Sequence, residues 1–378
     1  MTASAPTLSF RSRWCQWLAL LSMALILTGC ESVRYYWQAA RGHFELMQAV
    51  RPVDEVLEDP ATPARLRPHL EILKLARQFA AHTLALEAGD TYTGFVDLKR
   101  PAVVWNLFVS PVNRLELKTW CFPVAGCVGY RGYFSHEAAE AAARAYAGDD
   151  VWIGGAGAYS TLGWFDDPLL STMLGPTPLD TAALVFHELA HRTLYIPGDT
   201  ELNESWATFV EQVGAGQFAH TQGLQSDWAR YQQRQAARQA FTDLVAQLLN
   251  QLERAYQGAT TSDARARREP LFARFRSALI QCAEQHPSLT PWAQHWQRPL
   301  NNARLLTVRS YHRWVPALHV QFEALGGQWP AFRAWMQALA DQPRDARTLT
   351  LESLAQRAAR VANQSSRLTN TLEFRCQL

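Results

Sequence analysis

Two histidines and a glutamate lie close together in the stretch VFHELAHRTLYIPGDTELNESWATFVE, which runs from Val185 to Glu211. His187 and His191 are four residues apart, so on a helix both imidazoles lie on one face and can bind a single ion. Glu188 lies about 100° further round that helix, beside the ion and not on it. This spacing is typical of a site in which two histidines bind Zn²⁺ and the glutamate accepts a proton from the water activated there. The alternative interpretation is an amphipathic helix with two incidental histidines.

The residues that follow His191 decide which class of zinc site is predicted. A metzincin would have a third histidine six residues later, and that position is Pro197. The acidic candidates are Asp199, Glu201 and Glu204. Glu204 is the predicted third ligand, because a Pro-Gly turn returns the chain toward the first helix and NESWATFVE resembles the NExxA segment of gluzincin metallopeptidases. The gap after His191 is shorter than in most gluzincins, so Asp199 remains an alternative.

Two further polar residues near Glu204 could orient a ligand imidazole. Glu211 lies two turns after Glu204 on the same helix face, and Asn203 directly precedes it. The alternatives are a solvated charge for Glu211 and a helix cap for Asn203.

The elements expected to position these residues are two helices. Thr177 can cap the first, with Pro178 at its first position and Asp180 where a capping carboxylate belongs. The second follows the Pro-Gly turn and is expected to end near Gly214. Both predicted ligand groups therefore lie on helices joined by a short turn.

Outside these two helices the pattern alternates between strands and further helices. Runs rich in Val, Phe, Trp and Thr between residues 91 and 133, and the run VWIGGAGAYS at 151–160, predict strands. Residues 31–87 and those after about 217 have helical periodicity. The expected fold is mainly α with a small mixed β-sheet (α+β). Its predicted parts are a signal peptide (1–29), an N-terminal helical region (30–90), a catalytic region (91–216) and a C-terminal helical region that completes the active-site cleft (217–378).

The first thirty residues have the pattern of a secretory signal peptide. Arg11 and Arg13 precede an apolar run that ends in LTGC at Cys30. LTGC resembles the lipobox of bacterial lipoproteins, in which the cysteine carries lipid and becomes the first residue of the mature chain. Glu31, by resemblance to Gram-negative lipoproteins, favours the periplasmic face of the outer membrane. The alternative is an uncleaved membrane anchor, for which the run is short.

The remaining cysteines and the charge balance restrict the other classes of partner. In an oxidising compartment four cysteines would form two disulfides. The short loop CFPVAGC favours Cys121–Cys127, which leaves Cys282 with Cys376, although four cysteines allow three connectivities. A structural zinc at Cys121 and Cys127 is the alternative, with a spacing wider than usual. A net charge of +2, from 36 basic and 34 acidic residues, gives no reason to expect a nucleic-acid partner.

Four blocks of the sequence together resemble a known family. They are WCFPVAGCVGYRGYF, AYSTLGWFDDPLLSTML, FHELAHRTLYIPGDTELNESWATFVE and YHRWVPA, and the family is the bacterial predicted aminopeptidases, a group of zinc-dependent lipoproteins. The resemblance covers most of the mature chain. It implies a zincin-like metallopeptidase core that binds one Zn²⁺ through His187, His191 and Glu204, uses Glu188 as general base, and acts on a peptide.

Resemblance to gluzincins also implies a donor for the developing oxyanion. Tyr311 and His312 in RSYHRW fit that role, with Tyr195 behind them. The alternatives are a packed tyrosine and a core histidine.

The predicted strand before the zinc helix occupies the position of the zincin edge strand that pairs with an extended substrate. Gly154 and Gly155 would let a peptide backbone approach, and Tyr159 follows them. Asp166, or its neighbour Asp167, could bind the free amine of an aminopeptidase substrate. The usual aminopeptidase signature GxMEN is absent.

Two other functions are compatible with the sequence. One is a zinc endopeptidase that cleaves envelope proteins internally. The other is a non-catalytic envelope protein, in which some of the fourteen tryptophans line a peptidoglycan groove. No feature of the sequence sets an oligomeric state.

Overall fold

The structure is a computed structural model, and it describes residues 33–122, 126–159, 161, 166–309, 313–369 and 376–378. The predicted signal peptide, Cys30, Tyr311 and His312 therefore lie outside the described residues. The chain divides into two compact units, Met1–Ala49 and Val50–Leu378. A helix over residues 33–48 is the described part of the first unit. Among the described helices, none combines the length and the apolar character needed to cross a bilayer.

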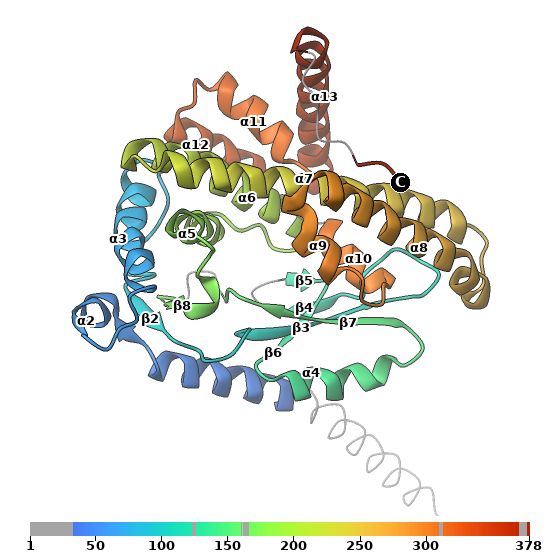
Figure 1. The fold of residues 1–378 in the computed structure, drawn as a ribbon, viewed down its shortest axis with the longest axis horizontal. Helices are drawn as coiled ribbons and strands as arrows, with labels where there is room; N and C mark the ends of the chain where they lie inside the picture. Colours follow the sequence, from blue (N-terminus) through green and yellow to red (C-terminus); the bar gives the residue numbers. More distant parts are fainter. Residues whose placement is uncertain (1–32, 123–125, 160, 162–165, 310–312, 370–375) are drawn as a thin grey trace, which may run out of the picture. The chain divides into compact units, whose positions relative to one another are not determined.

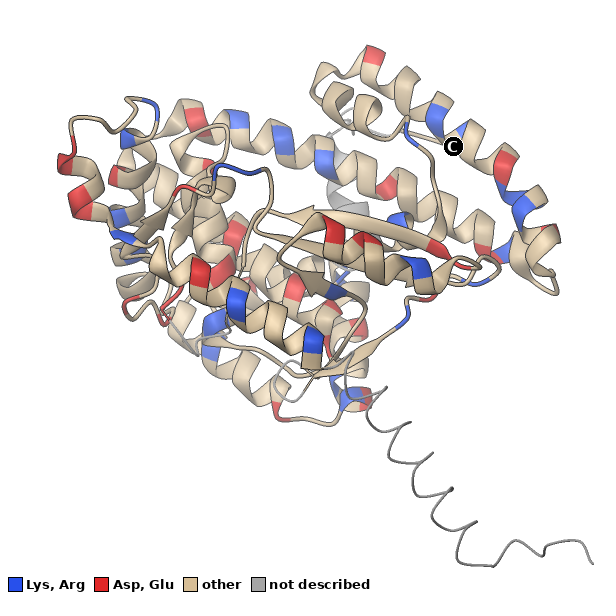
Figure 2. Cartoon of the chain, turned by 90° about the horizontal axis from the view of Figure 1, so that it is seen from below, with Lys and Arg blue, Asp and Glu red and all other residues tan. Residues whose placement is uncertain are grey.

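The second unit is mainly α-helical with small sheets, which confirms the predicted fold class (Figure 1). Its helices are α2 (Val53–Glu58), α3 (Arg67–His82), α4 (His136–Ala143), α5 (Pro178–Thr193), α6 (Thr200–Gln222), α7 (Gln225–Tyr256), α8 (Thr261–Gln285), α9 (Thr290–His295), α10 (Asn302–Arg309), α11 (Val315–Ala324), α12 (Trp329–Ala340) and α13 (Arg344–Thr369). Positive and negative side chains are interspersed along these helices (Figure 2).

The described strands form three small sheets. A mixed sheet has the order β1 (Arg51–Pro52), β2 (Gly94–Val96), β8 (Leu169–Leu170). An antiparallel sheet has the order β6 (Arg131–Tyr133), β3 (Val104–Ser110), β7 (Asp150–Ala156). The third is the hairpin of β4 (Trp120–Phe122) and β5 (Gly126–Val128). Strand β7 is thus an edge strand, paired through its whole length with β3.

Helix α5 begins as the sequence predicts and lies within the core of the second unit. The backbone N–H and the hydroxyl of Thr177 donate to the Asp180 carboxylate, which completes a capping box, and Pro178 occupies the first turn. The helix packs against α3, α6 and α7. Phe186 of α5 contacts Phe79 of α3 and Phe218 of α6 in an aromatic cluster. Burial of this apolar face holds the HExxH helix in place.

Helix α6 is longer than expected, and the predicted end near Gly214 is wrong. The helix continues to Gln222 and ends at Gly223, whose φ of 71° makes it a left-handed C-cap. A Cβ at Gly214 would lie 2.8 Å from Leu84 Cδ1 and 3.2 Å from Phe186 Cδ2. This glycine therefore allows close packing inside the helix and does not terminate it. The predicted division between residues 216 and 217 falls within α6.

Both predicted disulfides are present. Cys121–Cys127 joins opposed residues of the β4–β5 hairpin. Cys282–Cys376 ties the carboxyl-terminal residues to α8, within an apolar core that the α7–α8 hairpin shares with α9 and α10. The long helices α7 and α8 therefore each bury one side in this core.

A buried ion pair connects the edge strand to the helical hairpin. Arg268 of α8 donates to both carboxylate oxygens of Asp150 at 2.6 and 3.2 Å, and the Asn302 backbone N–H donates to the same carboxylate at 2.9 Å. Both charged side chains are buried. Removal of one partner would leave the other charge buried without compensation, which is strongly destabilising.

We therefore expect Asp150→Asn to lower the free energy of unfolding by about 3 kcal/mol. The matched control is Asp54→Asn, which breaks an exposed ion pair with Lys74 and should change the unfolding free energy by less than about 0.5 kcal/mol. Urea unfolding followed by circular dichroism measures both. Equal effects of the two substitutions would contradict a structural role for the Asp150–Arg268 pair.

Candidate metal centre

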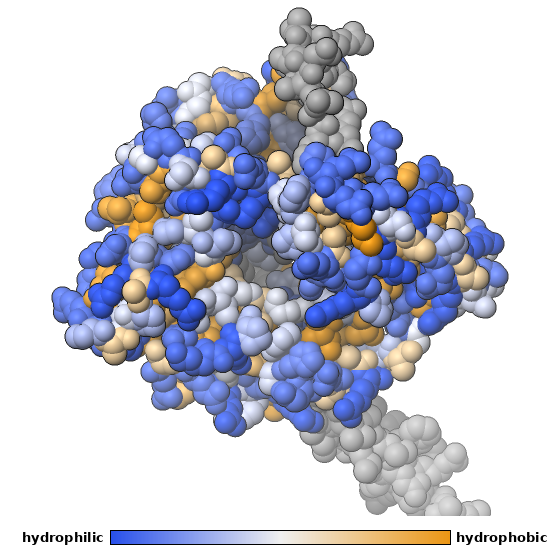
Figure 3. Space-filling model, in the orientation of Figure 1, coloured by the Kyte–Doolittle hydropathy of each residue, from blue (hydrophilic) through white to orange (hydrophobic). Residues whose placement is uncertain are grey.

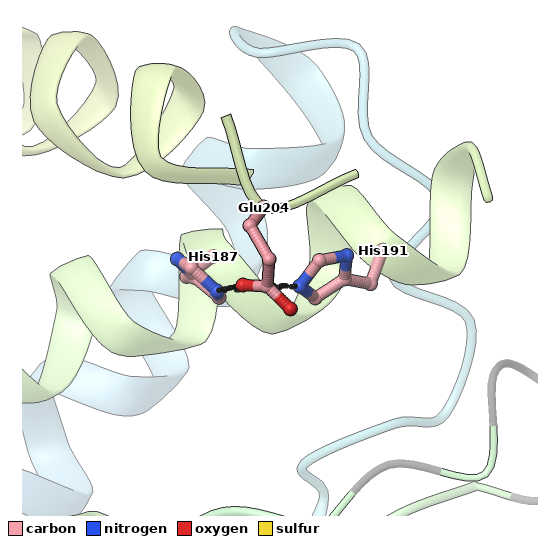
Figure 4. Close-up of side chains that lie close together, drawn as sticks. All are labelled: His187, His191 and Glu204. Carbon is pink, nitrogen blue, oxygen red and sulfur yellow. Dashed lines mark hydrogen bonds and ion pairs between the residues drawn. The ribbon is translucent and has the colours of Figure 1, made fainter. Parts of the chain in front are cut away.

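Three side chains from α5 and α6 converge on one point (Figure 4). His187 Nε2 lies 3.2 Å from His191 Nε2, and Glu204 Oε2 lies 3.5 and 3.7 Å from these two nitrogens. Ligand atoms bound tetrahedrally at about 2.0–2.1 Å from a zinc ion would lie roughly 3.3 Å apart. The three atoms are therefore spaced as ligands of one small ion, and the donor set of two imidazoles and a carboxylate suits a borderline metal.

Glu204 is held against α5 by the residues on either side of it. The Asn203 side chain accepts from the Ile196 backbone N–H and donates to the Ile196 carbonyl, both at 2.8 Å. The Trp206 indole N–H donates to the Ala190 carbonyl at 3.0 Å. These contacts fix the first turn of α6 against the end of α5 and the connecting loop. Asn203 thus orients the loop and not an imidazole.

The other two acidic candidates bind arginines elsewhere. Asp199 caps α6 and accepts from Arg347 of α13 at 2.9 Å, with both side chains mostly buried. Glu201 pairs with Arg313 at 2.9 Å. Neither belongs to the group of potential ligands found among the described residues.

Glu211 binds the side of His187 that faces away from the three ligand atoms. Its Oε2 lies 3.1 Å from His187 Nδ1, and its Oε1 accepts from the Tyr231 hydroxyl at 3.0 Å and from the Gln235 amide at 3.4 Å. A carboxylate on Nδ1 fixes the ring orientation and leaves Nε2 as the binding atom. Tyr231 and Gln235 lie on α7, and no spacing in the sequence indicates their role.

The charge on these carboxylates controls the protonation of His187. Burial alone would lower its pKa, but hydrogen bonds to Glu204 and Glu211 outweigh that effect and raise the pKa to about 10. For Glu204 the effects are reversed. Burial alone would raise its pKa, but hydrogen bonds to the two histidines and their charges lower it well below its usual range. The carboxylates therefore favour positive charge at this point, which a metal ion or a proton on His187 can supply.

The second histidine is supported differently. His191 Nδ1 is buried, and no hydrogen-bond partner for it occurs among the described residues. The two predicted ligand histidines are thus unequal, since Glu211 orients only His187.

Glu188 lies among charged side chains beside the three potential ligands. Burial raises the pKa of its carboxyl, the charges of Glu204 and Asp167 act in the same direction, and His187 and His191 oppose them. A carboxylate with a raised pKa is suited to accept a proton.

Tyr92 is a neighbour of Glu188 that the sequence does not indicate. Its side chain is fully buried, and burial followed by the charges of Glu188 and Asp167 raises its pKa well above the usual range. Its backbone has a φ of 62°, which is unfavourable for a side chain of this size. The Tyr92 backbone N–H donates to the Asp167 carbonyl at 2.7 Å. A strained backbone held in this way often occurs near a functional site.

The residues predicted to bind substrate are spread over β7 and the chain after it. Gly154 and Gly155 lie on edge strand β7, opposite Asn106 and Trp105 of β3. Tyr159 packs its ring against Phe134. In Figure 3 this face of the second unit is hollowed beside α5, on the side toward the sheet of β7.

Of the two aspartates predicted to bind a free amine, the structure brings only Asp167 into the surroundings of Glu188. Asp166 is exposed, and its carboxylate lies 3.5 Å from Arg192. Asp167 is buried and accepts from the Thr161 backbone N–H and hydroxyl at 2.8 and 2.9 Å.

Fold and site together define a mainly α-helical protein in which an HExxH helix and a crossing helix form a three-ligand candidate metal centre. Comparison with known families gives a match to the model described as "Putative aminopeptidase" over residues 34–351. The chain belongs to this family. No significant match was found among curated proteins or solved structures.

Proposed function

We propose that this chain is a zinc-dependent metallopeptidase, most specifically an aminopeptidase. The observation that carries the proposal is the spacing of His187 Nε2, His191 Nε2 and Glu204 Oε2, which all lie within 4.8 Å of one another. When bound there, Zn²⁺ would polarise the substrate carbonyl and make water a better nucleophile. Family membership supports peptide hydrolysis, and the donor set supports zinc.

The other side chains of the site have separate roles in catalysis. Glu188 accepts the proton of the attacking water and passes it to the leaving amine. Glu211 keeps His187 in the binding tautomer, with Tyr231 and Gln235 holding the carboxylate. Tyr195 is a candidate oxyanion donor, and burial together with the charge of Glu204 raises its pKa, so the half-buried phenol keeps the proton that a donor needs. The same role for Tyr311 and His312 stays a prediction.

Two features support a peptide as the substrate. Strand β7 has β3 as its partner on one side, and Gly155 is exposed on it, so an extended peptide can be proposed to add along the other edge. Asn301 already donates to the Val151 carbonyl at 2.8 Å, which leaves the half of the strand with Gly154 and Gly155 for this pairing. Asp167, because of its electrostatic contact with Glu188, is the better candidate for recognising the substrate amine.

We further propose that the mature protein is secreted and anchored by lipid on Cys30 at the periplasmic face of the outer membrane. The apolar run, the LTGC sequence and the two disulfides support this location.

The role of the tryptophans gives little support to a peptidoglycan-binding protein. Trp206, Trp296, Trp314 and Trp329 are all buried in the core. Arg304 of α10 lies between the rings of Trp152 and Trp296, with 4.5 and 4.3 Å to their centroids. The four buried tryptophans therefore stabilise the fold and cannot line an open groove.

The proposed activity can be tested on amino-acid amides and short peptides. Each substrate is compared with its own form acetylated at the amino terminus. An aminopeptidase releases product from the free amines and from none of the acetylated peptides. Cleavage within acetylated peptides would instead establish an endopeptidase. Inactivity of the zinc-loaded protein on both sets would contradict peptide hydrolysis by this site.

Substitutions behind His187 should weaken zinc binding without changing a ligand. We expect Glu211→Gln to lower zinc affinity by about 10–100-fold and Tyr231→Phe by about tenfold, since each loosens the support of the imidazole. Gln239→Ala is the matched control on α7, because Gln239 is exposed and donates to the exposed Asp243 carboxylate at 2.9 Å. Competition with a fluorescent chelator measures all three affinities. An unchanged affinity in Glu211→Gln would remove this support from the site.

A further inference from the structure

The helix over residues 33–48 exposes an apolar stripe. Val33, Trp37, Ala40 and Phe44 recur at a spacing that places them on one face of the helix. The exposed fractions of Val33, Trp37 and Phe44 are 68%, 71% and 62%. Tyr36, which is 51% exposed, borders the stripe.

This arrangement differs from that of an ordinary surface helix. A surface helix normally carries polar residues on its outer side, whereas here the side opposite the stripe holds the buried Leu46. The helix therefore has apolar residues on two sides, and those of the stripe are exposed. A contiguous exposed apolar patch marks a site of interaction.

Basic residues border the stripe on one side. At about 100° per residue, Arg34 and Arg41 lie next to Val33, Trp37 and Phe44 around the helix. Arg41 forms an exposed ion pair with Glu45, 2.7 Å apart. This combination suits a bilayer with anionic lipids. The apolar side chains match its hydrocarbon interior, and the arginines match its anionic headgroups.

The position of the helix in the chain indicates that the stripe lies near the bilayer surface. Val33 is three residues from Cys30, and an extended chain spans at most about 3.6 Å per residue. With lipid on Cys30, the first turn of the helix must lie within roughly 10 Å of the bilayer surface. Tryptophan and tyrosine are the aromatic residues enriched at that depth, where the ring is apolar and the polar group remains wet.

We propose that the stripe of Val33, Trp37, Ala40 and Phe44 lies in the headgroup region of the membrane, with Arg34 and Arg41 against lipid phosphates. This inference rests on the lipid anchor of the proposed function and goes beyond it, because it assigns a protein surface to the bilayer. The helix lies parallel to the membrane plane and is a second attachment beside the lipid.

Two nitroxide labels on the mature acylated chain test the proposal. Ala40→Cys places a label in the stripe, and Glu45→Cys places one on an exposed neighbouring position outside it. The other cysteines of the mature chain are acylated or paired in disulfides. Each protein is reconstituted at one copy per lipid nanodisc of phosphatidylethanolamine and phosphatidylglycerol (3:1). Collision rates with an aqueous nickel chelate and with oxygen are then measured by electron paramagnetic resonance.

We expect the collision rate with the nickel chelate to be about fivefold lower at position 40 than at position 45, with the opposite order for oxygen. Equal accessibility of the two labels would overturn the proposal. Protection at position 40 that requires high protein concentration in detergent, with spin–spin coupling between copies, would also overturn it and assign the stripe to a second copy of the chain. The mass of the amino-terminal peptide reports acylation, and amide hydrolysis by the same preparation reports enzyme activity. A failure of the proposed function is therefore distinguishable from a failure of this inference.

Discussion

Glu188→Gln should retain one bound zinc and lose peptide hydrolysis, with kcat falling by about 10³-fold, within the range of general acid–base catalysis. The substitution keeps the size of the side chain but removes the group that accepts the proton. His187, His191 and Glu204 remain available to bind the ion, because Glu188 is not among the three converging residues. Zinc content by mass spectrometry and hydrolysis of an amino-acid amide measure the two effects in one preparation.

A graded substitution and a distant one make this result specific. Glu188→Asp retains a carboxylate but withdraws it by one methylene, so its activity should lie between those of the wild type and Glu188→Gln. Glu201→Gln changes a glutamate that pairs with Arg313 and should leave kcat unchanged. Full activity of Glu188→Gln would remove Glu188 from proton transfer. Loss of zinc from the same variant would instead make it part of the metal site.

The local elements of the site could be predicted because short-range rules determine them. The Thr177 and Asp180 capping box fixes the start of α5, and the spacing of His187 and His191 then places both on one face. Glu204 could be selected because the Pro-Gly turn constrains where α6 returns. The short loop CFPVAGC indicated the Cys121–Cys127 pair, which left Cys282 with Cys376, and resemblance to zincins indicated the edge strand.

Features that depend on packing between distant segments could not be predicted. Gly214 resembles a helix terminator in the sequence, and only contact with Leu84 and Phe186 explains why it lies inside α6. Tyr231 supports Glu211 because α7 folds back along α6, and no residue pattern encodes that partner. Tyr92 reaches the surroundings of Glu188 through a loop with left-handed backbone. Such partners follow from tertiary structure, which periodicity and motif spacing do not specify.

Glu204→Ala should weaken zinc binding enough for the metal to be lost on prolonged dialysis, while binding persists at high metal concentration. Structural zinc sites of four ligands contribute about 10–16 kcal/mol, so loss of one ligand costs roughly 3–4 kcal/mol, or about 10²–10³-fold in affinity. Glu201→Ala is the matched control, because Glu201 was an alternative ligand and pairs with the exposed Arg313. Metal content after dialysis measures both variants. Zinc retained in Glu204→Ala to the same extent as in Glu201→Ala would contradict the role of Glu204 as the third ligand.

Proton release gives a second test of the same ligand, independent of activity. Because the pKa of His187 is raised to about 10 in the metal-free site, this side chain is protonated at pH 7 and must lose its proton when zinc binds. Zinc affinity should therefore rise about tenfold per pH unit between about pH 6 and 9. Calorimetry in two buffers of different protonation enthalpy should show about one proton released. Glu204→Ala removes one of the two carboxylates that retain this proton, so the pKa of His187 should fall and fewer protons should be released at the upper end of that range. Zinc affinity that is independent of pH in the wild type would show that His187 is already neutral before zinc binds. Glu204 and Glu211 would then not keep this imidazole protonated.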